Sequence, residues 1–267
     1  MSPSRQSPSN LLRRLTADQE PFLTVRSMAS NLSSGYVIEE HTHPWHQFVC
    51  ACTGAMTVYG GRSSWIIPPG KGVFLPAGIT HSIRMWGDVA ARSLYFPASL
   101  NAPALAGDAC RVVSLTPLLR ELILRVIELR ALDSRIPAHQ SLLNVLLDEM
   151  NDEMNLAPET PLLLPLPAES RALAVARYVL DVPGSASTLD DLAHRYGASR
   201  RTLERLFRRQ TGLSFGLWRQ KVRLLHAIRL LAEGKSVTET ALDTGYASLS
   251  AFIAAFKRTF GYTPGRL

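Results

Sequence analysis

The sequence predicts an α+β protein of two domains: an N-terminal β-barrel that carries a helical hairpin, and a C-terminal all-α domain with tandem helix-turn-helix motifs. Three observations lead to this fold class. Short β-like segments separated by glycine and proline fill residues 22–97. Two segments with helical periodicity follow them. The last hundred residues or so then carry one helix-turn-helix pattern twice.

The N-terminal stretch is rich in serine and proline and lacks the apolar run of a signal peptide. We therefore expect residues 1–20 to form a flexible tail and residues 21–100 to form the barrel. Turn signals such as Thr53-Gly54 and Gly60-Gly61 separate the candidate strands. The candidate strands are residues 22–28, 35–40, 47–53, 55–59, 62–67, 72–75, 82–85 and 91–96.

Two amphipathic helices, at residues 116–132 and 138–155, predict an antiparallel hairpin within residues 115–155. Their apolar faces are wide enough to cover the barrel and to leave a stripe for a second subunit, so we expect a homodimer. Packing within one chain is the alternative. Pro158, Pro161, Pro165 and Pro167 predict an extended linker at residues 156–169.

The C-terminal segment, residues 170–267, repeats its landmarks. Ala193 and Gly197 recur as Ala241 and Gly245, and beyond the turn Ser199 recurs as Ser248. A small residue lets the helices of such a motif approach closely, glycine ends the first helix, and serine caps the second. One continuous helix, predicted at residues 215–233, would fix the separation of the two motifs.

The positive charge lies in the same segment. The chain has a net charge of +7, and residues 171–267 hold 16 Lys and Arg against 7 Asp and Glu, whereas residues 1–170 hold 13 against 15. A basic domain with this motif predicts a double-stranded DNA operator as partner. A solvated basic face is the alternative.

The first predicted recognition helix, residues 200–209, has an apolar side and an arginine-rich side. We expect Arg201 and Arg205 to read base edges and Glu204 to accept from a cytosine amine. The residues expected at phosphates are Arg200, Arg208 and Arg209.

The second predicted recognition helix has a nearly apolar outer side, so we expect it to position the protein more than to discriminate bases. Its predicted DNA contacts are Ser248, Leu249, Ser250, Ala254, Lys257 and Arg258.

The stretch from Gly245 through Phe252 and Phe256 to Pro264 resembles the signature of AraC-type regulators, and Ser199 to Phe207 resembles the first recognition helix of that family. The resemblance implies a bihelical domain that binds successive major-groove segments and regulates transcription. Many members carry a polar or arginine side chain where Ala254 stands.

A histidine-rich stretch precedes one of the strands. On a strand, His41 and His43 would point to one face, and His81 could join them from a neighbouring strand. Three imidazoles with Gln47 predict a site for a divalent transition metal such as Zn, Ni or Fe. Polar pocket lining or surface histidines are the alternative.

The same residues resemble the cupin family, whose motifs supply His-x-His, a nearby Glu, and a later His after a Pro-x-Gly turn. Pro76 to His81 fits the second motif, and Gln47 stands at the Glu position. AraC-type regulators often carry a cupin-like effector domain, which would account for the whole chain. The side chains expected to wall an effector pocket, with a structural core as the alternative, are Trp45, His46, Trp65, Phe74 and Trp86.

Together these features predict a sequence-specific transcriptional regulator that senses a small molecule or metal, with RNA polymerase as a further candidate partner. The alternatives are a metal-dependent cupin enzyme fused to a DNA-binding module and a non-sensing DNA-binding dimer. Gln47 and the lack of a catalytic constellation argue against an enzyme. Three cysteines without a disulfide framework and no long apolar run predict a cytoplasmic protein without a membrane partner.

Overall fold

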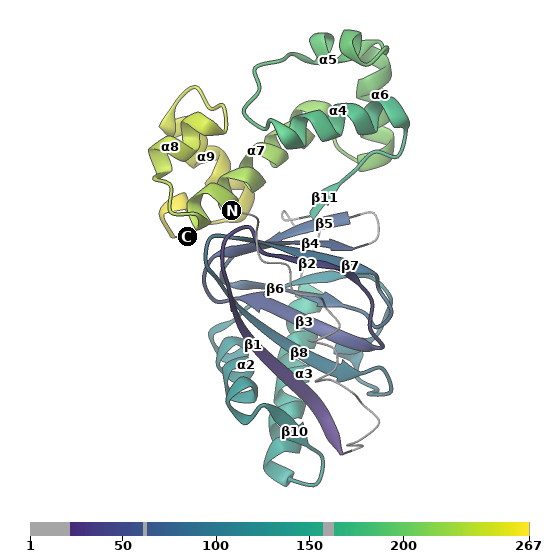
Figure 1. Cartoon of the computed structure of the whole chain (residues 1–267), viewed down its shortest axis with the longest axis vertical. Helices are drawn as coiled ribbons and strands as arrows, with labels where there is room; N and C mark the ends of the chain where they lie inside the picture. Colours follow the sequence, from purple (N-terminus) through teal and green to yellow (C-terminus); the bar gives the residue numbers. More distant parts are fainter. Residues whose placement is uncertain (1–21, 61–62, 157–162, 267) are drawn as a thin grey trace. The chain divides into compact units, whose positions relative to one another are not determined.

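The computed structural model describes residues 22–60, 63–156 and 163–266. The predicted tail and the central part of the predicted linker therefore lie outside the described residues. The chain forms two compact units, one of Met1–Gly61 with Trp65–Thr160 and the other of Arg62–Ser64 with Pro161–Leu267 (Figure 1). Among the described helices, none combines the length and the apolar character needed to cross a membrane.

The first unit is built from antiparallel strands. All eight predicted strands are present: β1 Leu23–Leu32, β2 Val37–His41, β3 Trp45–Ala51, β4 Ala55–Gly60, β5 Ser63–Ile67, β6 Lys71–Leu75, β7 His81–Trp86 and β8 Val89–Pro97. The sequence did not predict β9 (Arg111–Ser114), β10 (Ala131–Asp133) or the 3-10 helix η3 (Pro103–Leu105). Three or four residues are too few to show a period.

These strands form two sheets within the β-rich N-terminal domain that the sequence predicted. The first sheet has the order β10-β1-β8-β3-β6-β9, and the order β5-β4-β7-β2 runs through the second. The predicted hairpin is present as α2 (Pro117–Leu129) and α3 (Pro137–Leu156), joined through β10. Both helices lie against the outer face of the six-stranded sheet (Figure 1).

Strand β3 divides its side chains between the two faces of this sheet. Phe48 and Cys50 belong to the apolar cluster that Leu119 and Ile123 of α2 also enter. Gln47 lies on the opposite face, where it meets Tyr95 of β8. This alternation is the ordinary two-residue period of a strand, and it gives the two faces of β3 separate environments.

The second unit is helical and follows the predicted repeat. It contains the short strand β11 (Leu163–Pro165), α4 (Ser170–Asp181), α5 (Leu189–Arg195), α6 (Arg200–Thr211), α7 (Phe215–Ala232), α8 (Val237–Asp243), α9 (Leu249–Phe260) and the 3-10 helix η4 (Pro264–Arg266). Ser199 and Ser248 cap α6 and α9, as predicted. Gly212 and Gly261 end these helices in the left-handed conformation that glycine adopts readily.

Arginines of the connecting helix α7 join the two motifs. The Arg223 guanidinium donates to the carbonyl oxygens of Pro183 and Ser185, ahead of α5, and to that of Gly245, after α8. Arg219 donates to the Ser187 carbonyl at 2.6 Å and also to that of Ser185. These bonds are charge-assisted, and all but the exposed bond to Gly245 are partly buried. They hold two loops that lie far apart in the sequence against one helix.

The loop ahead of α5 also touches the second motif directly, and this contact gives a test. A Cβ atom on Gly184 would lie 2.4 Å from the backbone oxygen of Asp243, whereas one on Gly216 would meet nothing within 4 Å. We predict that Gly184→Ala destabilises the C-terminal unit by about 1–3 kcal/mol, because backbone must move to make room. Hydrogen exchange of the α7 amides in the full chain measures this stability.

Gly216→Ala is the matched control, since it adds the same methyl group at the start of α7 in open space. It should be neutral or stabilising by up to about 1 kcal/mol. Equal effects of the two substitutions would contradict a tight contact at Gly184.

Candidate DNA-binding surface and histidine cluster

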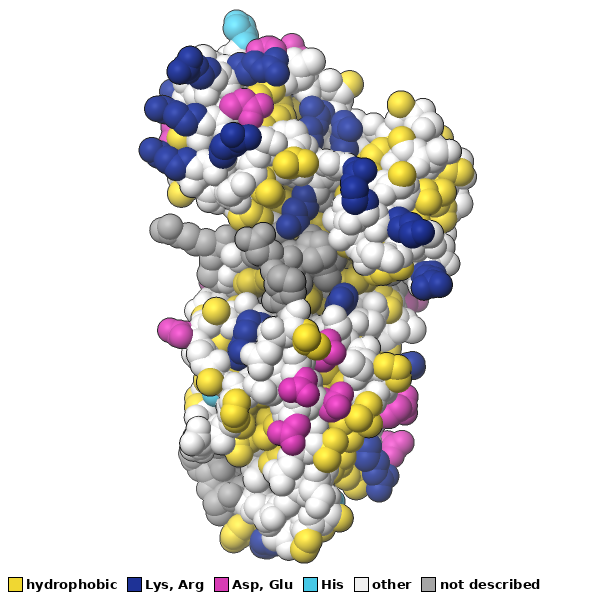
Figure 2. Space-filling view, turned by 180° about the vertical axis from the view of Figure 1, so that it is seen from behind, with side chains coloured by type: hydrophobic (Ala, Val, Ile, Leu, Met, Phe, Trp, Pro, Cys, Tyr) yellow, Lys and Arg dark blue, Asp and Glu magenta, His cyan; other side chains and the backbone are white. Residues whose placement is uncertain are grey.

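The helix α6 presents a basic outer side on a firmly packed base. Its inner residue Phe207 is fully buried. The centroid of the Phe207 ring lies 5.1 Å from that of Phe215 and 5.1 Å from that of Trp218. Lys and Arg side chains gather over the C-terminal unit on the face that Figure 2 shows. The predicted base-reading residues Arg201 and Arg205 are exposed, and neither forms an ion pair within the described part of the chain.

The predicted phosphate contacts of α6 are also exposed. Arg208 and Arg209 lie in the last turn of the helix. Arg200 donates to Asp190 at 2.9 Å, but both side chains are more than 60% exposed (63% and 62%). Such a surface ion pair contributes at most about 1 kcal/mol, so Arg200 can exchange its partner for a phosphate.

Glu204 has a local role that the sequence did not indicate. Its carboxylate accepts from the backbone nitrogen of Phe215, the first residue of α7, at 3.4 Å, and the residue is half-buried. A carboxylate at a helix N-terminus is stabilised by the unpaired amides there. The geometry thus favours a helix-capping contact for Glu204 over the predicted contact with cytosine.

The second recognition helix, α9, presents a different surface. The Ser248 hydroxyl accepts from the backbone nitrogen of Ala251 at 3.2 Å, so this side chain caps the N-terminus of α9. Leu249 is 39% exposed, and Ser250 and Ala254 are exposed as well. The charged residues predicted for this helix, Lys257 and Arg258, are exposed in its last turn.

The three predicted metal-binding histidines come together in the first unit. One ligand atom from each of His41, His43 and His81 lies within 4.8 Å of the others. Among the described residues, this is a group of three that could hold a metal ion. Gln47 joins them, because its Oε1 lies 3.1 Å from the Nε2 atoms of both His43 and His81.

Each histidine ring is oriented by the backbone. The Nδ1 atoms of His41, His43 and His81 lie 2.8, 3.0 and 2.9 Å from the carbonyl oxygens of Glu39, Trp45 and Ile79. A carbonyl can only accept, so Nδ1 carries the proton and Nε2 keeps its lone pair. Burial lowers the pKa of His81 to about 4 and also lowers that of His43, so both are neutral near pH 7.

These donors fit a divalent metal. Neutral imidazoles whose Nδ1 atoms are held by carbonyls are the usual form of metal-ligating histidine. Two Nε2 lone pairs also face the Gln47 amide, and there are two ways to satisfy them. As placed, the Gln47 oxygen faces the imidazoles and its nitrogen donates to Tyr95. Either the amide turns over, so that its NH2 group donates to the imidazoles and its oxygen accepts from the Tyr95 hydroxyl, or a cation takes the lone pairs and the amide oxygen together.

The path of the chain to this cluster differs from the prediction. His41 ends β2 and is the register partner of His81 on β7, whereas His43 lies in the connection between β2 and β3. The two histidines therefore do not alternate along one strand. Pro44 follows His43 and separates the strands, and the pairing of β2 with β7 brings the rings together.

The five aromatic residues predicted to wall an effector pocket do not share one face. Trp45 packs on Tyr95, whereas Phe74 is fully buried in the cluster beneath α2 and α3, with His46 stacked on it at 5.5 Å. Trp65 is buried on β5, and Trp86 donates to Thr57 at 2.8 Å. The sequence predicted that this strand starts at Gln47; because β3 begins at Trp45, Trp45 and His46 point to opposite faces of the sheet.

Comparison with known proteins places this architecture in a family. The model of an AraC-like ligand binding domain matches residues 29–146, and that of a helix-turn-helix domain matches residues 192–267. The HTH-type transcriptional regulator NimR of Escherichia coli (strain K12) is 31% identical over 227 residues, which cover 85% of this chain and 80% of NimR. The chain belongs to the AraC family of transcriptional regulators. This AraC-family protein thus joins a ligand-binding domain to a helix-turn-helix DNA-binding domain.

Two solved structures are also similar to this AraC-family protein. The DNA-binding domain of AdpA in complex with a target DNA is 32% identical and covers 37% of this chain and 89% of its own, with a TM-score of 0.35. ToxT from Vibrio cholerae strain SCE256 is 13% identical and covers 91% of this chain and 94% of its own, with a TM-score of 0.36.

Proposed function

We propose that the protein reads a double-stranded operator mainly through α6 and responds to a metal ion or small molecule held in the first unit. The observation that carries the proposal is the unequal chemistry of the two recognition helices. Four arginines are exposed on α6 without an ion-pair partner among the described residues: Arg201, Arg205, Arg208 and Arg209.

The arginines of α6 suit base recognition. A guanidinium can donate two hydrogen bonds to the O6 and N7 atoms of guanine, and each such pair discriminates against a wrong base by about 1–3 kcal/mol. Arg201 and Arg205 are four residues apart and therefore share one side of the helix. The outer side of α9 instead carries small residues and a leucine that can contact a thymine methyl group. We therefore assign α9 the role of positioning the protein on the DNA backbone.

The proposed signal is bound in the first unit. A metal ion would be held by His41, His43, His81 and Gln47, and it would supply positive charge that fixes these side chains relative to one another. An effector changes DNA binding only if it binds two states of the protein with different affinity. Because Gln47 is neutral and the relatives are named transcriptional regulators, we propose sensing and not catalysis.

We also propose that the hairpin of α2 and α3 joins two copies of the chain. Leu118 on α2 and Val145 on α3 are 50% and 44% exposed although their neighbours on the inner faces are buried. Exposed apolar residues on paired helices support a helix-to-helix interface between subunits.

The operator prediction concerns α6 and α9. We expect Arg205→Ala to relax base preference at one or two operator positions and to weaken specific binding by about tenfold or more, because it removes a bidentate contact. Ser250→Ala should leave the preference nearly unchanged. Selection of binding sites from a random duplex library, followed by titration at fixed salt, measures both. Similar losses for the two variants would show that α6 does not dominate recognition.

The metal prediction concerns the cluster of His41, His43 and His81 with Gln47. Protein without a histidine tag, incubated with Zn, Ni or Fe(II) and dialysed, should retain about one ion per chain by elemental analysis, and His43→Gln should bind at least about tenfold more weakly. His46→Gln is the matched control, because the Nδ1 of His46 accepts from the Ala77 nitrogen and its ring stacks on Phe74. Parent protein that takes up none of these metals would end the metal proposal.

The subunit prediction concerns α3. We expect Val145→Glu to shift the protein from dimer toward monomer, since a buried carboxylate opposes association. Asn144→Glu introduces the same charge at an exposed neighbouring position and should have the smaller effect. Sedimentation equilibrium of the full chain measures the two dissociation constants. A parent protein that is monomeric at micromolar concentration would contradict the proposed interface.

A further inference from the structure

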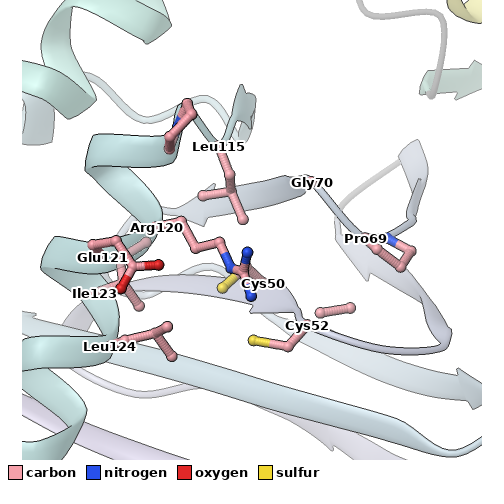
Figure 3. A pocket seen from close by; sticks show the side chains of 11 residues that line it. Cys50, Cys52, Pro69, Gly70, Leu115, Arg120, Glu121, Ile123 and Leu124 are labelled. Atoms are coloured by element: carbon pink, nitrogen blue, oxygen red, sulfur yellow. The ribbon is translucent and has the colours of Figure 1, made fainter. Parts of the chain in front are cut away.

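A pocket of the first unit lies on the face of β3 opposite the histidine cluster. It has a volume of about 370 Å³ and opens between the end of β3, the turn at Pro69 and Gly70, and helix α2 (Figure 3). The side chains that give it chemical character are Cys50, Cys52, Arg120 and Glu121. Nothing in the proposed DNA or metal binding uses these four residues.

The two cysteines are placed to interact. Cys50 lies in the last part of β3 and Cys52 in the bend that follows it, and both line the pocket beside α2. Cys50 is 2% exposed and packs in the cluster with Ile123, whereas Cys52 is only half-buried. The thiols of Cys50 and Cys52 interact, and each shifts the pKa of the other. Both line the pocket, and Cys52 is the more exposed of the two.

The contact with Cys50, together with nearby positive charge, favours ionisation of the Cys52 thiol. The hydrogen bond from Cys50, with the nearby guanidinium groups of Arg92 and Arg120, lowers the pKa of Cys52 to about 6. The same hydrogen bond and burial raise the pKa of Cys50. Burial raises the pKa of the third cysteine, Cys110, to about 11. Near pH 7 Cys52 is therefore mostly a thiolate, while Cys50 and Cys110 remain thiols.

We propose that Cys50 and Cys52 form an oxidisable dithiol whose substrate is a hydroperoxide that enters this pocket. The geometry supplies an accessible nucleophile, a second thiol in the wall of the same pocket, and the Arg120 guanidinium in that wall as well. This inference does not depend on the proposed operator or metal binding.

The chemistry balances with the hydroperoxide as the oxidant. The Cys52 thiolate attacks the terminal oxygen, the O–O bond breaks, and the alcohol leaves after taking up a proton, which forms a sulfenic acid. The Cys50 sulfur then attacks the Cys52 sulfur, the S–O bond breaks, and the hydroxide leaves as water with the Cys50 proton. The protein loses two hydrogen atoms, and the hydroperoxide is reduced to an alcohol and water.

Formation of this bridge requires a local movement of the backbone. Residues two apart on a strand have Cα atoms about 6.6 Å apart, near the upper limit of about 6.8 Å for a disulfide. Cys52 lies in the bend that follows β3, and its backbone nitrogen donates to the Ala90 carbonyl at 2.9 Å, so this hydrogen bond must give way for the gap to close. Closing it draws the Cys50 sulfur away from its packing against α2.

The test uses the full chain and hydrogen peroxide as the probe. Reduced protein is mixed with peroxide at pH 7, and peptides are followed by mass spectrometry. We expect the peptide that contains Cys50 and Cys52 to lose 2 Da, about 30-fold faster than Cys110 is modified. This ratio follows because Cys52 has about 10⁴ times the thiolate fraction of Cys110, offset by about 300-fold lower intrinsic nucleophilicity.

Variants separate the two roles. Cys50→Ser should stop the reaction at a sulfenic acid on Cys52 that dimedone traps, Cys52→Ser should abolish the fast reaction, and Cys110→Ser should behave as the parent. The parent protein alone also decides the matter, whatever the variants do to folding. Oxidation of Cys52 no faster than that of Cys110, or oxidation that leaves Cys50 a free thiol, would overturn the proposal.

Discussion

The C-terminal unit depends on two arginines of one helix. Arg219 and Arg223 on α7 donate to carbonyl oxygens of the loop ahead of α5, and Arg223 also donates to that of Gly245 in the turn of the second motif. These carbonyls belong to loops, where the backbone lacks partners in a helix or a strand. The guanidinium groups therefore supply hydrogen-bond donors for these loop carbonyls, and they fix α6 and α9 relative to α7. Two recognition helices held in this way can meet DNA only where its grooves present themselves at a matching interval.

Within that frame, the two motifs share a scaffold and differ in their surfaces. Both have a serine cap at the recognition helix and a left-handed glycine at its end. The outer side of α6 carries exposed arginines, four of them without an ion-pair partner in the described part of the chain, whereas that of α9 carries Leu249, Ser250 and Ala254. The repeated residues are those that the fold requires, and the residues that vary are those that can distinguish one DNA sequence from another. In the proposed function, base discrimination is therefore assigned mainly to α6 and positioning on the DNA to α9.

Local features of the fold could be predicted from the sequence, and features that depend on distant contacts could not. Ser199, Gly212 and the long helix α7 follow from rules that act within a few residues. The meeting of His41, His43 and His81 could be expected from their motifs, but the place of His43 between strands could not. The capping contact of Glu204 with α7 was not foreseeable, because it joins residues eleven apart across a turn. The pocket beside Cys50 was missed for a similar reason, since α2 forms one of its walls.

The alternation of side chains along β3 has a consequence for how this protein can change over time. Gln47 faces the imidazoles, and Cys50 faces α2, only three positions further along the same strand. Deleting or inserting a single residue between them would turn one of the two groups to the wrong side. Point substitutions can tune either chemistry separately, but changes of length in this strand affect both together. Lineages that keep one of these features should therefore preserve the spacing even where the other has been lost.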